Sequence, residues 1–379
     1  MILPGATLGV LGGGQLGRMF TMRAREMGYR VIVLEPDGAS PAGAVADQHL
    51  RAAYDDPAAL DALAAAAAAV TIEFENVPSG ALERLGRQVP VRPSPHAVAI
   101  AQDRIREKCF VRDHGFETAR FAVVAHADDL QPAWDAIGAP ALLKTTRLGY
   151  DGKGQVAIDS PRELHDGFAA FGSVPCVLEQ RLELERELSV VLVRGVDGNT
   201  VPFPVGENTH RQGILDTTVV PARVSDRVAG EANRIAGEVA AKLGYVGVLG
   251  VELFVACGER LFVNEIAPRP HNTGHYTLDA CTVDQFEQQV RALCELPLGS
   301  PALLSPVAMV NLLGDAWAGG TPRWERALAL PGVKLHLYGK AEPRPGRKMG
   351  HFNCFAPTPD AALALARRAH AALIDHPSS

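Results

Sequence analysis

Two glutamates stand at matching positions of a β-hairpin pattern. Val248–Val255 and Leu261–Ile266 are both strand-like, and a short polar segment separates them. If Gly258–Glu259 forms a type II′ turn, counting outward places Glu252 directly opposite Glu265. Facing carboxylates in an apolar hairpin repel each other, and Mg²⁺, usually held by one or two carboxylates together with nucleotide phosphates, offsets that repulsion. The hairpin therefore predicts a magnesium site; the alternative is a longer turn that leaves one glutamate in solvent.

A glycine-rich loop upstream suggests a polyphosphate ligand. Residues 145–155 contain three glycines and lie between two strand-like runs, 141–144 and 156–158. Glycine N–H groups can approach an anion closely, and Lys144 and Lys153 supply positive charge. Because strands flank the loop on both sides, it differs from a P-loop, which leads into a helix. We expect a flap over phosphates; the alternative is an exposed hairpin that its lysines keep soluble.

A polar loop follows the second carboxylate strand. Pro268 and Pro270 exclude a helix through residues 267–275, so we expect these side chains on a substrate-facing loop. His271 and His275 lack the H-E-x-x-H spacing of a zinc site, which speaks against zinc binding by this loop.

A basic turn near the carboxyl end is a candidate anion clamp. Lys340 precedes it, and residues 344–348 read Arg-Pro-Gly-Arg-Lys. Guanidinium and ammonium groups gathered around a Pro-Gly turn suit a phosphate. The net charge of the chain is −6, so this local basic cluster favours anion binding over its alternative, an ordinary basic surface loop.

The first residues read as strand, glycine turn, helix and strand. Thr7–Leu11 is apolar, Gly12–Gly17 matches G-x-G-x-x-G, Arg18–Met27 is amphipathic, and Tyr29–Leu34 ends at an acidic residue. Taken alone, this pattern is typical of a dinucleotide-binding dehydrogenase. The same turn serves many folds that need only a tight strand-to-helix crossing, so it indicates a Rossmann-like parallel sheet more firmly than a cofactor.

Further elements extend this amino-terminal unit. Val70–Phe74 reads as another parallel strand and places Glu73 at the carboxyl edge of the sheet, where ligands collect in open α/β folds. A solvated loop acid is the alternative for Glu73. A cluster of prolines between residues 90 and 95 predicts a boundary before a helix over Ala97–His114.

Length and composition exclude several classes of protein. The 379 residues, 47% hydrophobic and 21% charged, suit two or three folded domains. The negative net charge gives no reason to expect nucleic-acid binding, and no apolar stretch is long enough to span a bilayer. Six cysteines without a C-x-x-C pair indicate reduced, mostly buried thiols. We therefore expect a cytoplasmic protein without nucleic-acid or membrane partners.

The order of these features resembles the ATP-grasp superfamily and, within it, the 5-(carboxyamino)imidazole ribonucleotide synthases. The resemblance covers nearly the whole chain. The segments that carry it are Gly12–Met19, Thr71–Asn76, Gly149–Gln155, Glu179–Leu182, Gly244–Val248, Arg269–His275 and Arg344–Lys348.

The resemblance implies a fold of the α/β and α+β classes with three parts. These are a Rossmann-like amino-terminal domain at 1–107, an ATP-grasp region at 108–297 with a flap subdomain at about 118–182, and a carboxy-terminal mixed-sheet domain at 298–379 that completes the substrate site. It also implies a homodimer.

The resemblance also assigns residues to ligands. For ATP it implies Arg104, Lys144, Gly149, Tyr150, Asp151, Gly152, Lys153, Gly154, Gln155, Glu179, Gln180, Arg181, Leu182, Glu187, His210, Asn264 and Glu265. For one or two Mg²⁺ ions it implies Glu252 and Glu265, and for the ribonucleotide Gln15, Leu16, Glu73, His271, Asn272, Lys340, Arg347 and Lys348. The catalytic residues that it implies are Lys153, Glu252, Glu265, Arg269 and His275. The hinge departs from the family, because Gln180 and Arg181 replace the more common acidic and aromatic pair.

The implied reaction is the ATP-dependent carboxylation of 5-aminoimidazole ribonucleotide by bicarbonate, through carboxyphosphate, in purine biosynthesis. Three alternatives stay open. A sibling ligase that joins formate to glycinamide ribonucleotide would share the ATP machinery, although the loop Arg269–His275 speaks against it. A nicotinamide dehydrogenase would explain only the amino-terminal pattern. A catalytically silent nucleotide-binding regulator would have no need for both Glu252 and Glu265.

Overall fold

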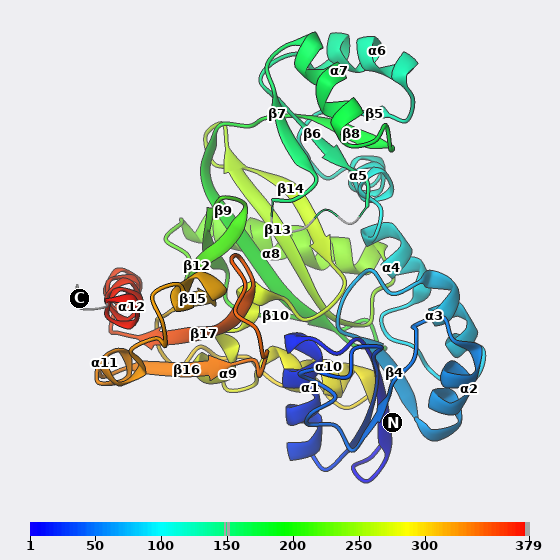
Figure 1. Ribbon diagram of the computed structural model, residues 1–379, viewed down its shortest axis with the longest axis vertical. Coiled ribbons are helices and arrows are strands. Elements are labelled where there is room, and N and C mark those ends of the chain that lie inside the picture. The colour runs from blue at the N-terminus through cyan, green and yellow to red at the C-terminus, as the bar shows by residue number, and fades with distance from the viewer. Residues whose placement is uncertain (148, 150–151, 376–379) are drawn as a thin grey trace.

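The computed structural model describes residues 1–147, 149 and 152–375 (Figure 1). The chain begins with a parallel sheet in the order β3-β2-β1-β4. Strands β1, β2 and β4 are almost wholly buried, as in sheets with helices on both faces, whereas the edge strand β3 is partly exposed. The elements of this part are β1 (Thr7–Leu11), α1 (Gln15–Glu26), β2 (Arg30–Leu34), β3 (Gln48–Leu50), α2 (Pro57–Ala66), β4 (Ala69–Ile72), α3 (Ser79–Gly86) and α4 (Pro95–Ala101).

The single helix expected over residues 97–114 is wrong. The segment forms two helices, α4 and α5 (Arg104–Asp113), with Asp103 between them. The carboxylate of Asp103 accepts hydrogen bonds from the backbone N–H groups of Ile105 and Arg106, so it caps α5 as a separate helix. Helix α5 packs against α4 and against strands β8 and β14, whose bounds are given below.

A small antiparallel sheet in the order β5-β8-β6-β7 follows, at the top of Figure 1. Helices α6 and α7 pack on it around a core that includes Leu143, Phe168 and Leu178. Strands β6 and β7 are antiparallel neighbours, and Lys144 pairs with Gln155, so the loop between them is the strand-flanked flap that the sequence predicts. The elements are β5 (Phe121–Val124), η1 (Ala127–Asp129), α6 (Leu130–Ile137), β6 (Ala141–Thr145), β7 (Gln155–Ile158), α7 (Pro161–Ala170) and β8 (Cys176–Gln180).

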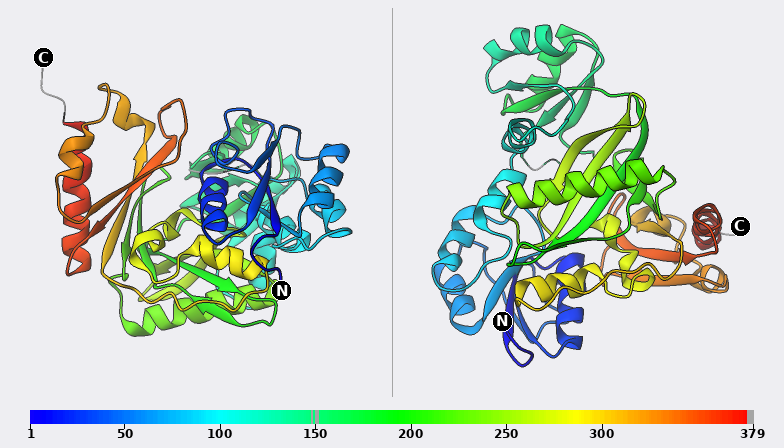
Figure 2. Two further views of the ribbon diagram at one scale, coloured as in Figure 1. Left: turned by 90° about the horizontal axis from the view of Figure 1, so that it is seen from below. Right: turned by 180° about the vertical axis from the view of Figure 1, so that it is seen from behind.

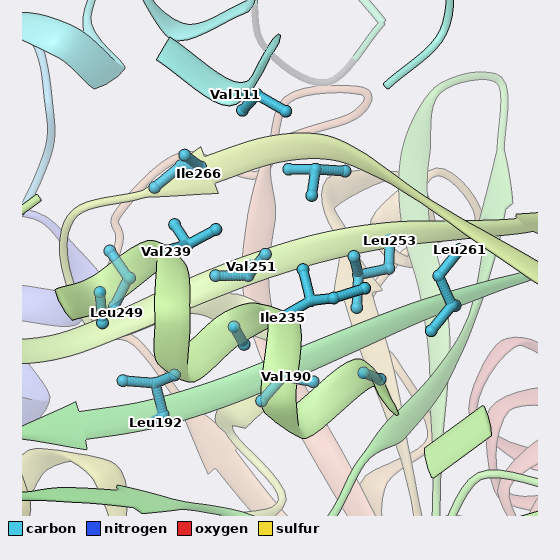
Figure 3. Close-up of a cluster of buried hydrophobic side chains, with 14 of the residues drawn as sticks. Val111, Val190, Leu192, Ile235, Val239, Leu249, Val251, Leu253, Leu261 and Ile266 are labelled. Carbon is cyan, nitrogen blue, oxygen red and sulfur yellow. The ribbon is translucent and has the colours of Figure 1, made fainter. Parts of the chain in front are cut away.

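The largest sheet runs in the order β14-β13-β9-β11-β12-β15-β17-β16, with β10 paired to β9. Helix α8 crosses one face of this sheet and builds the core shown in Figure 3 from apolar side chains of α8, β9, β13 and β14. The elements are β9 (Leu184–Arg194), β10 (Thr200–Pro202), β11 (Gly206–Arg211), β12 (Ile214–Val220), α8 (Asp226–Lys242), β13 (Gly247–Ala256), β14 (Arg260–Ala267), η2 (Asn272–Gly274), α9 (Thr277–Ala280) and α10 (Gln285–Leu293).

Helix α10 joins the largest sheet to the amino-terminal unit. It lies beside α1 (Figure 1), and its Phe286 and Val290 belong to the same apolar core as Leu8 and Phe20. The side chain of Gln289 donates a hydrogen bond to Thr71 Oγ1 on β4 and accepts one from the backbone N–H of Val248 at the start of β13. Segments far apart in the sequence thus hold the two sheets at a fixed relation.

The carboxy-terminal part extends the largest sheet. Residues 217–220 of β12 pair with residues 307–310 of β15, so this part shares a sheet with the preceding region. Helices α11 and α12 cover a further core on this part of the sheet (Figure 2). Its elements are β15 (Val307–Leu313), η3 (Gly314–Trp317), α11 (Trp324–Leu328), β16 (Val333–Leu337), β17 (Lys348–Phe355) and α12 (Pro359–Ile374). No helix in the described ranges is long and apolar enough to cross a bilayer.

Candidate active site

Glu252 and Glu265 face each other across β13 and β14, as the sequence predicts. The turn that joins the strands differs from the prediction. Ala256 pairs with Arg260, so the turn has three residues, Cys257, Gly258 and Glu259, with φ of 53°, 79° and 63°. The two-residue turn of the prediction paired the correct carboxylates, although the register that it gave for the residues near the turn was wrong.

A bulge at Asn264 offsets the third residue of the turn and so restores the pairing of Glu252 with Glu265. Leu253 pairs with Val263 and Glu252 pairs with Glu265, which leaves Asn264 as the extra residue of β14. The bulge also brings the side chain of Asn264 beside Glu252: Asn264 Nδ2 lies 3.4 Å from Glu252 Oε2. Asn264 Oδ1 is buried and has no hydrogen-bond partner among the described residues.

The oxygens at the bulge suit a hard cation. Burial and the neighbouring charge of Glu265 raise the pKa of Glu252 to about 7. A bound cation would relieve this repulsion between the two carboxylates. A guanidinium nitrogen of Arg104 is 3.7 Å from Glu265 Oε2 and offsets part of this repulsion. Two carboxylates and an unpartnered amide oxygen are ligand types that Mg²⁺ accepts. Within the described ranges no group of three or more His, Cys, Asp or Glu side chains has the geometry of a metal site, so a cation here would complete its shell with other oxygens.

The carboxylate pair opens into a cleft of about 1190 Å³ between the flap sheet and the largest sheet. The residues expected at ATP line this cleft in large part, namely Arg104, Lys144, Gly149, Gly152, Lys153, Gln155, Glu179, Gln180, Arg181, Leu182, Glu187, His210, Asn264 and Glu265. Tyr150 and Asp151 lie outside the described residues. Gly154 does not line the cleft; its φ is +69°, and a Cβ there would lie 2.5 Å from Thr145 Oγ1, so it shapes the flap turn.

Two ion pairs order the walls of the cleft. Lys144 Nζ donates to Glu179 Oε2 at 2.8 Å, which joins β6 to β8. His210 Nδ1 and Glu187 Oε2 are 2.5 Å apart and join β11 to β9. Burial lowers the pKa of His210, but the hydrogen bond to Glu187 and the negative charges of Glu252 and Glu187 together outweigh burial and raise that pKa above its ordinary value.

The far end of the cleft, opposite the flap sheet, carries the polar loop that follows β14. Gln15, Leu16, Glu73, Arg269, His271, Asn272 and Lys348 line it, and their role at a substrate stays a prediction. Both polar atoms of the buried Asn272 amide lack a hydrogen-bond partner within the described part of the chain. Arg269 Nε donates to Glu75 Oε2 at 2.5 Å. Burial raises the pKa of Glu75, but the charge and hydrogen bond of Arg269, together with smaller effects that include the charge of Lys348, lower this pKa below its ordinary value. The sequence prediction missed Glu75, although it follows the same strand as Glu73.

The glycine turn is filled by the protein itself. Glu73 accepts hydrogen bonds from the backbone N–H groups of Gly14 at 2.5 Å and Gly17 at 2.8 Å. A Cβ on Gly12 would lie 2.3 Å from Glu73 Cγ, so the turn needs glycine to admit this carboxylate. In dinucleotide-binding folds these amides hold a pyrophosphate. The turn therefore fixes a side chain of β4 at the edge of the cleft.

Besides Gly154, three described residues that were expected at the site do not line the cleft. His275 is fully buried, with its Nδ1 3.1 Å from Gln285 Nε2 and its ring stacked on His351, so it lies behind the cleft wall, and its catalytic role stays a prediction. Lys340 Nζ donates to the backbone oxygen of Lys348, and Arg347 donates to that of Glu342. These cations brace the basic turn, and of Lys340, Arg347 and Lys348 only Lys348 lines the cleft.

Comparison with known protein families matches three consecutive parts of the chain. Residues 5–102 match the ribonucleotide synthetase preATP-grasp domain, residues 109–286 the ATP-grasp domain, and residues 307–365 the phosphoribosylaminoimidazole carboxylase C-terminal domain. Together with the cleft between the flap and the carboxylate hairpin, these matches define the class of the protein: it is an ATP-grasp ligase.

The relatives narrow this class. The chain is 46% identical over 356 residues to the N5-carboxyaminoimidazole ribonucleotide synthase of Brucella melitensis, covering 93% of this chain and 97% of the relative, and 43% identical to that of Bacillus subtilis, covering 93% and 92%. A structure of the Aspergillus clavatus synthase with ADP and 5-aminoimidazole ribonucleotide superimposes with a TM-score of 0.89 at 30% identity, covering 97% of this chain and 98% of that one. The chain belongs to the N5-carboxyaminoimidazole ribonucleotide synthase family.

Proposed function

We propose that this protein uses ATP to carboxylate the exocyclic amine of 5-aminoimidazole ribonucleotide with bicarbonate. The products are N5-carboxyaminoimidazole ribonucleotide, ADP and phosphate. The observation that carries the proposal is that Glu252, Asn264 and Glu265 line the same cleft as the nucleotide-type residues and the loop at Arg269–Asn272. Glu265 lies 3.7 Å from Arg104 of the first group, and Glu252 lies 3.7 Å from His271 of the second. Relatives described with ADP, ATP and this ribonucleotide support it.

The nucleotide end binds ATP in this proposal. The hinge Glu179–Leu182 holds the adenine, the Glu187 and His210 pair lies at the ribose, and the cations of Lys144 and Lys153 meet the phosphates. Gln180 and Arg181 differ from the family pattern at the hinge, but their backbone N–H groups are bonded to Arg120 O and Pro140 O. The hinge backbone is therefore held in place without the usual side chains.

Glu252, Glu265 and Asn264 would hold Mg²⁺. Bound there, Mg²⁺ supplies positive charge next to the transferring phosphoryl group. Arg104, 3.7 Å from Glu265, orients that carboxylate. The number of ions, one or two, stays a prediction, as does the homodimer.

The chemistry needs two balanced steps. An oxygen of bicarbonate attacks the γ-phosphorus of ATP, and the bond between this phosphorus and the bridging oxygen to the β-phosphate breaks. The products of this step are carboxyphosphate and ADP. The amine nitrogen then attacks the carboxyl carbon, the C–O bond to phosphate breaks, and the nitrogen gives up a proton. Arg269 and Asn272 line the place where the intermediate forms, and the flap excludes water that would hydrolyse it.

His271 has the properties of a neutral group that binds the substrate by hydrogen bonding. Burial, together with the charges of Arg269 and Lys348, lowers the pKa of His271 well below its ordinary value, so the ring is neutral at neutral pH. Its Nδ1 is 2.8 Å from Thr273 Oγ1, which orients the ring, and its Nε2 is 3.7 Å from Glu252 Oε1.

The ribonucleotide would occupy the far end of the cleft. Gln15, Leu16, Glu73 and Lys348 line that end, and Lys340 and Arg347 support Lys348 from behind. In this arrangement Lys348 provides charge for the 5′-phosphate.

Phosphate release from Mg·ATP and bicarbonate, measured with and without 5-aminoimidazole ribonucleotide, tests the proposal. We expect strong stimulation by the ribonucleotide and formation of the labile carboxyamino product from ¹³C-bicarbonate. Stimulation only by formate with glycinamide ribonucleotide would identify the sibling ligase instead. Reduction of a nicotinamide cofactor, or nucleotide binding without turnover, would equally refute the proposal.

A further inference from the structure

Three charged side chains from three elements meet behind the nucleotide end of the cleft. Glu179 Oε2 on β8 lies 2.8 Å from Lys144 Nζ on β6 and 3.4 Å from Lys108 Nζ on α5. The side chains of Lys108, Glu179 and Lys144 are 1%, 3% and 9% exposed. One buried carboxylate is thus shared by two ammonium groups.

The two lysines differ in what they can reach. Lys144 lines the cleft together with Glu179, whereas Lys108 does not. Lys108 Nζ donates to Thr118 Oγ1 at 3.0 Å, and Thr118 Oγ1 donates to the backbone oxygen of Val263 at 2.8 Å. Val263 directly precedes the bulge residue Asn264, so Lys108 ties the hinge strand to the carboxylate hairpin from outside the cleft.

The charges of this group allow its two lysines to have different roles. Burial raises the pKa of Glu179, but the charges of Lys108, Lys144 and Arg104 and the hydrogen bond from Lys144 together outweigh burial and bring that pKa to about 2, so the carboxylate stays ionised. A buried carboxylate with one lysine would hold that lysine tightly, because a buried charge without a partner is costly. With two lysines, one can serve the carboxylate while the other serves a ligand.

We propose that Lys108 is a positioning residue that neutralises Glu179, so that the charge of Lys144 is available to the nucleotide phosphates. This inference rests on the proposed function, since it takes the cleft at Lys144 to bind ATP. Lys108 itself contacts no ligand. Its loss should therefore weaken the binding of nucleotides, which carry phosphates, more than the binding of nucleosides, which do not.

Calorimetry on the full-length protein tests this role with Mg·ADP and adenosine as probes. In Lys108→Met, Glu179 retains Lys144 as its hydrogen-bonded lysine, and we expect ADP to bind about 10-fold or more weakly, the effect of losing a hydrogen bond to a charged group. Adenosine, which lacks phosphates, should bind within about twofold of its wild-type affinity on the same reasoning. The exposed Lys242→Met on α8 is the matched control and should change neither value.

A second pair of variants separates positioning from simple loss of stability. In Glu179→Gln no carboxylate competes for Lys144, so adding Lys108→Met should leave ADP affinity unchanged. Lys108→Met/Glu179→Gln also removes one buried acid and one buried base together, which protects folding if the single lysine variant does not fold. A purely structural role would lower the melting temperature of Lys108→Met without changing the ratio of ADP to adenosine affinity.

The outcomes are distinct. Equal losses of ADP and adenosine affinity in Lys108→Met, or a double variant that binds ADP 10-fold more weakly than Glu179→Gln, would overturn the role of Lys108. Lys144→Met reports on the proposed function itself. If it weakens ADP binding while Lys108→Met does not, only the inference fails; if it leaves ADP binding unchanged, the assignment of the nucleotide cleft fails with it.

Discussion

Glu252 and Glu265 stand opposite each other only because Asn264 bulges out of the β14 ladder. With Ala256 paired to Arg260, an unbroken register would place Glu252 opposite Asn264 and turn Glu265 to the other face of the sheet. The bulge thus gathers three oxygen-bearing side chains on one face of the hairpin. A cation site of this kind depends on one inserted residue.

Replacing Glu265 should remove catalysis and leave the fold. We expect Glu265→Gln to lower kcat at least about 100-fold, because a neutral amide holds a cation beside the phosphates poorly. The measurement is ribonucleotide-dependent phosphate release, with the melting temperature as a check on folding. Glu259→Gln, on the exposed turn of the same hairpin, is the control and should turn over normally. Normal turnover by Glu265→Gln would remove the metal assignment.

Replacing Glu252 should stabilise the protein in the absence of metal, in a pH-dependent way. The pKa of Glu252 is about 7 in the folded protein, above its ordinary value, because of burial and Glu265. A carboxyl with a raised pKa favours the folded state at low pH, and this contribution is lost as the pH rises from about 4.3 toward 7.

Denaturant unfolding of Glu252→Gln and wild type in EDTA measures this effect. We expect the variant to be more stable than wild type at pH 8, by on the order of 1 kcal/mol or more, and the difference to shrink at pH 5, where Glu252 is protonated. A difference that is the same at both pH values would show that charge repulsion at Glu252 is not its cause.

The buried histidines should make the protein lose stability in mild acid. His351 is stacked between His275 and His336, and burial lowers its pKa well below 6.5. Because its pKa is depressed in the folded state, the unfolded chain binds the extra proton, and stability falls as the pH drops below about 6.5.

Unfolding free energies between pH 7.5 and 5 measure this slope. His351→Gln should reduce the slope by up to about 1.4 kcal/mol per pH unit, the effect of one proton. His165→Gln, at an exposed histidine of α7, should leave the slope as it is. An unchanged slope in His351→Gln would mean that other groups account for the acid sensitivity.

Removing the carboxylate of Glu73 should destabilise the amino-terminal domain. Glu73→Ala leaves the N–H groups of Gly14 and Gly17 without their acceptor, which costs about 1–3 kcal/mol for partly buried donors. Urea unfolding measures the loss. Since the same carboxylate fills the glycine turn, wild type should show no binding of a nicotinamide dinucleotide by calorimetry; micromolar binding would contradict this arrangement.

Short-range patterns in the sequence were enough to place several features. Glycine and proline positions, together with the apolar alternation of the hairpin strands, predicted the parallel amino-terminal sheet, the strand-flanked flap and the Glu252–Glu265 pair. These features depend on neighbours within about 20 residues, where turn chemistry and side-chain periodicity act directly. The break at Asp103 was missed because the apolar pattern continues through it, although an aspartate before a helix is a capping signal.

Contacts between distant segments needed the tertiary structure. Glu73 enters the glycine turn only because β4 lies beside β1, and Lys108 reaches Glu179 only because α5 is packed between the flap and β14. His275 belongs to a polar loop in the sequence, yet packing against β17 buries it away from the cleft. Residue types and spacing thus determined which chemistry the chain carries, whereas the register of β14 and the packing of separate elements decided which side chains share the site, because both follow from the burial of the whole core and not from local propensity.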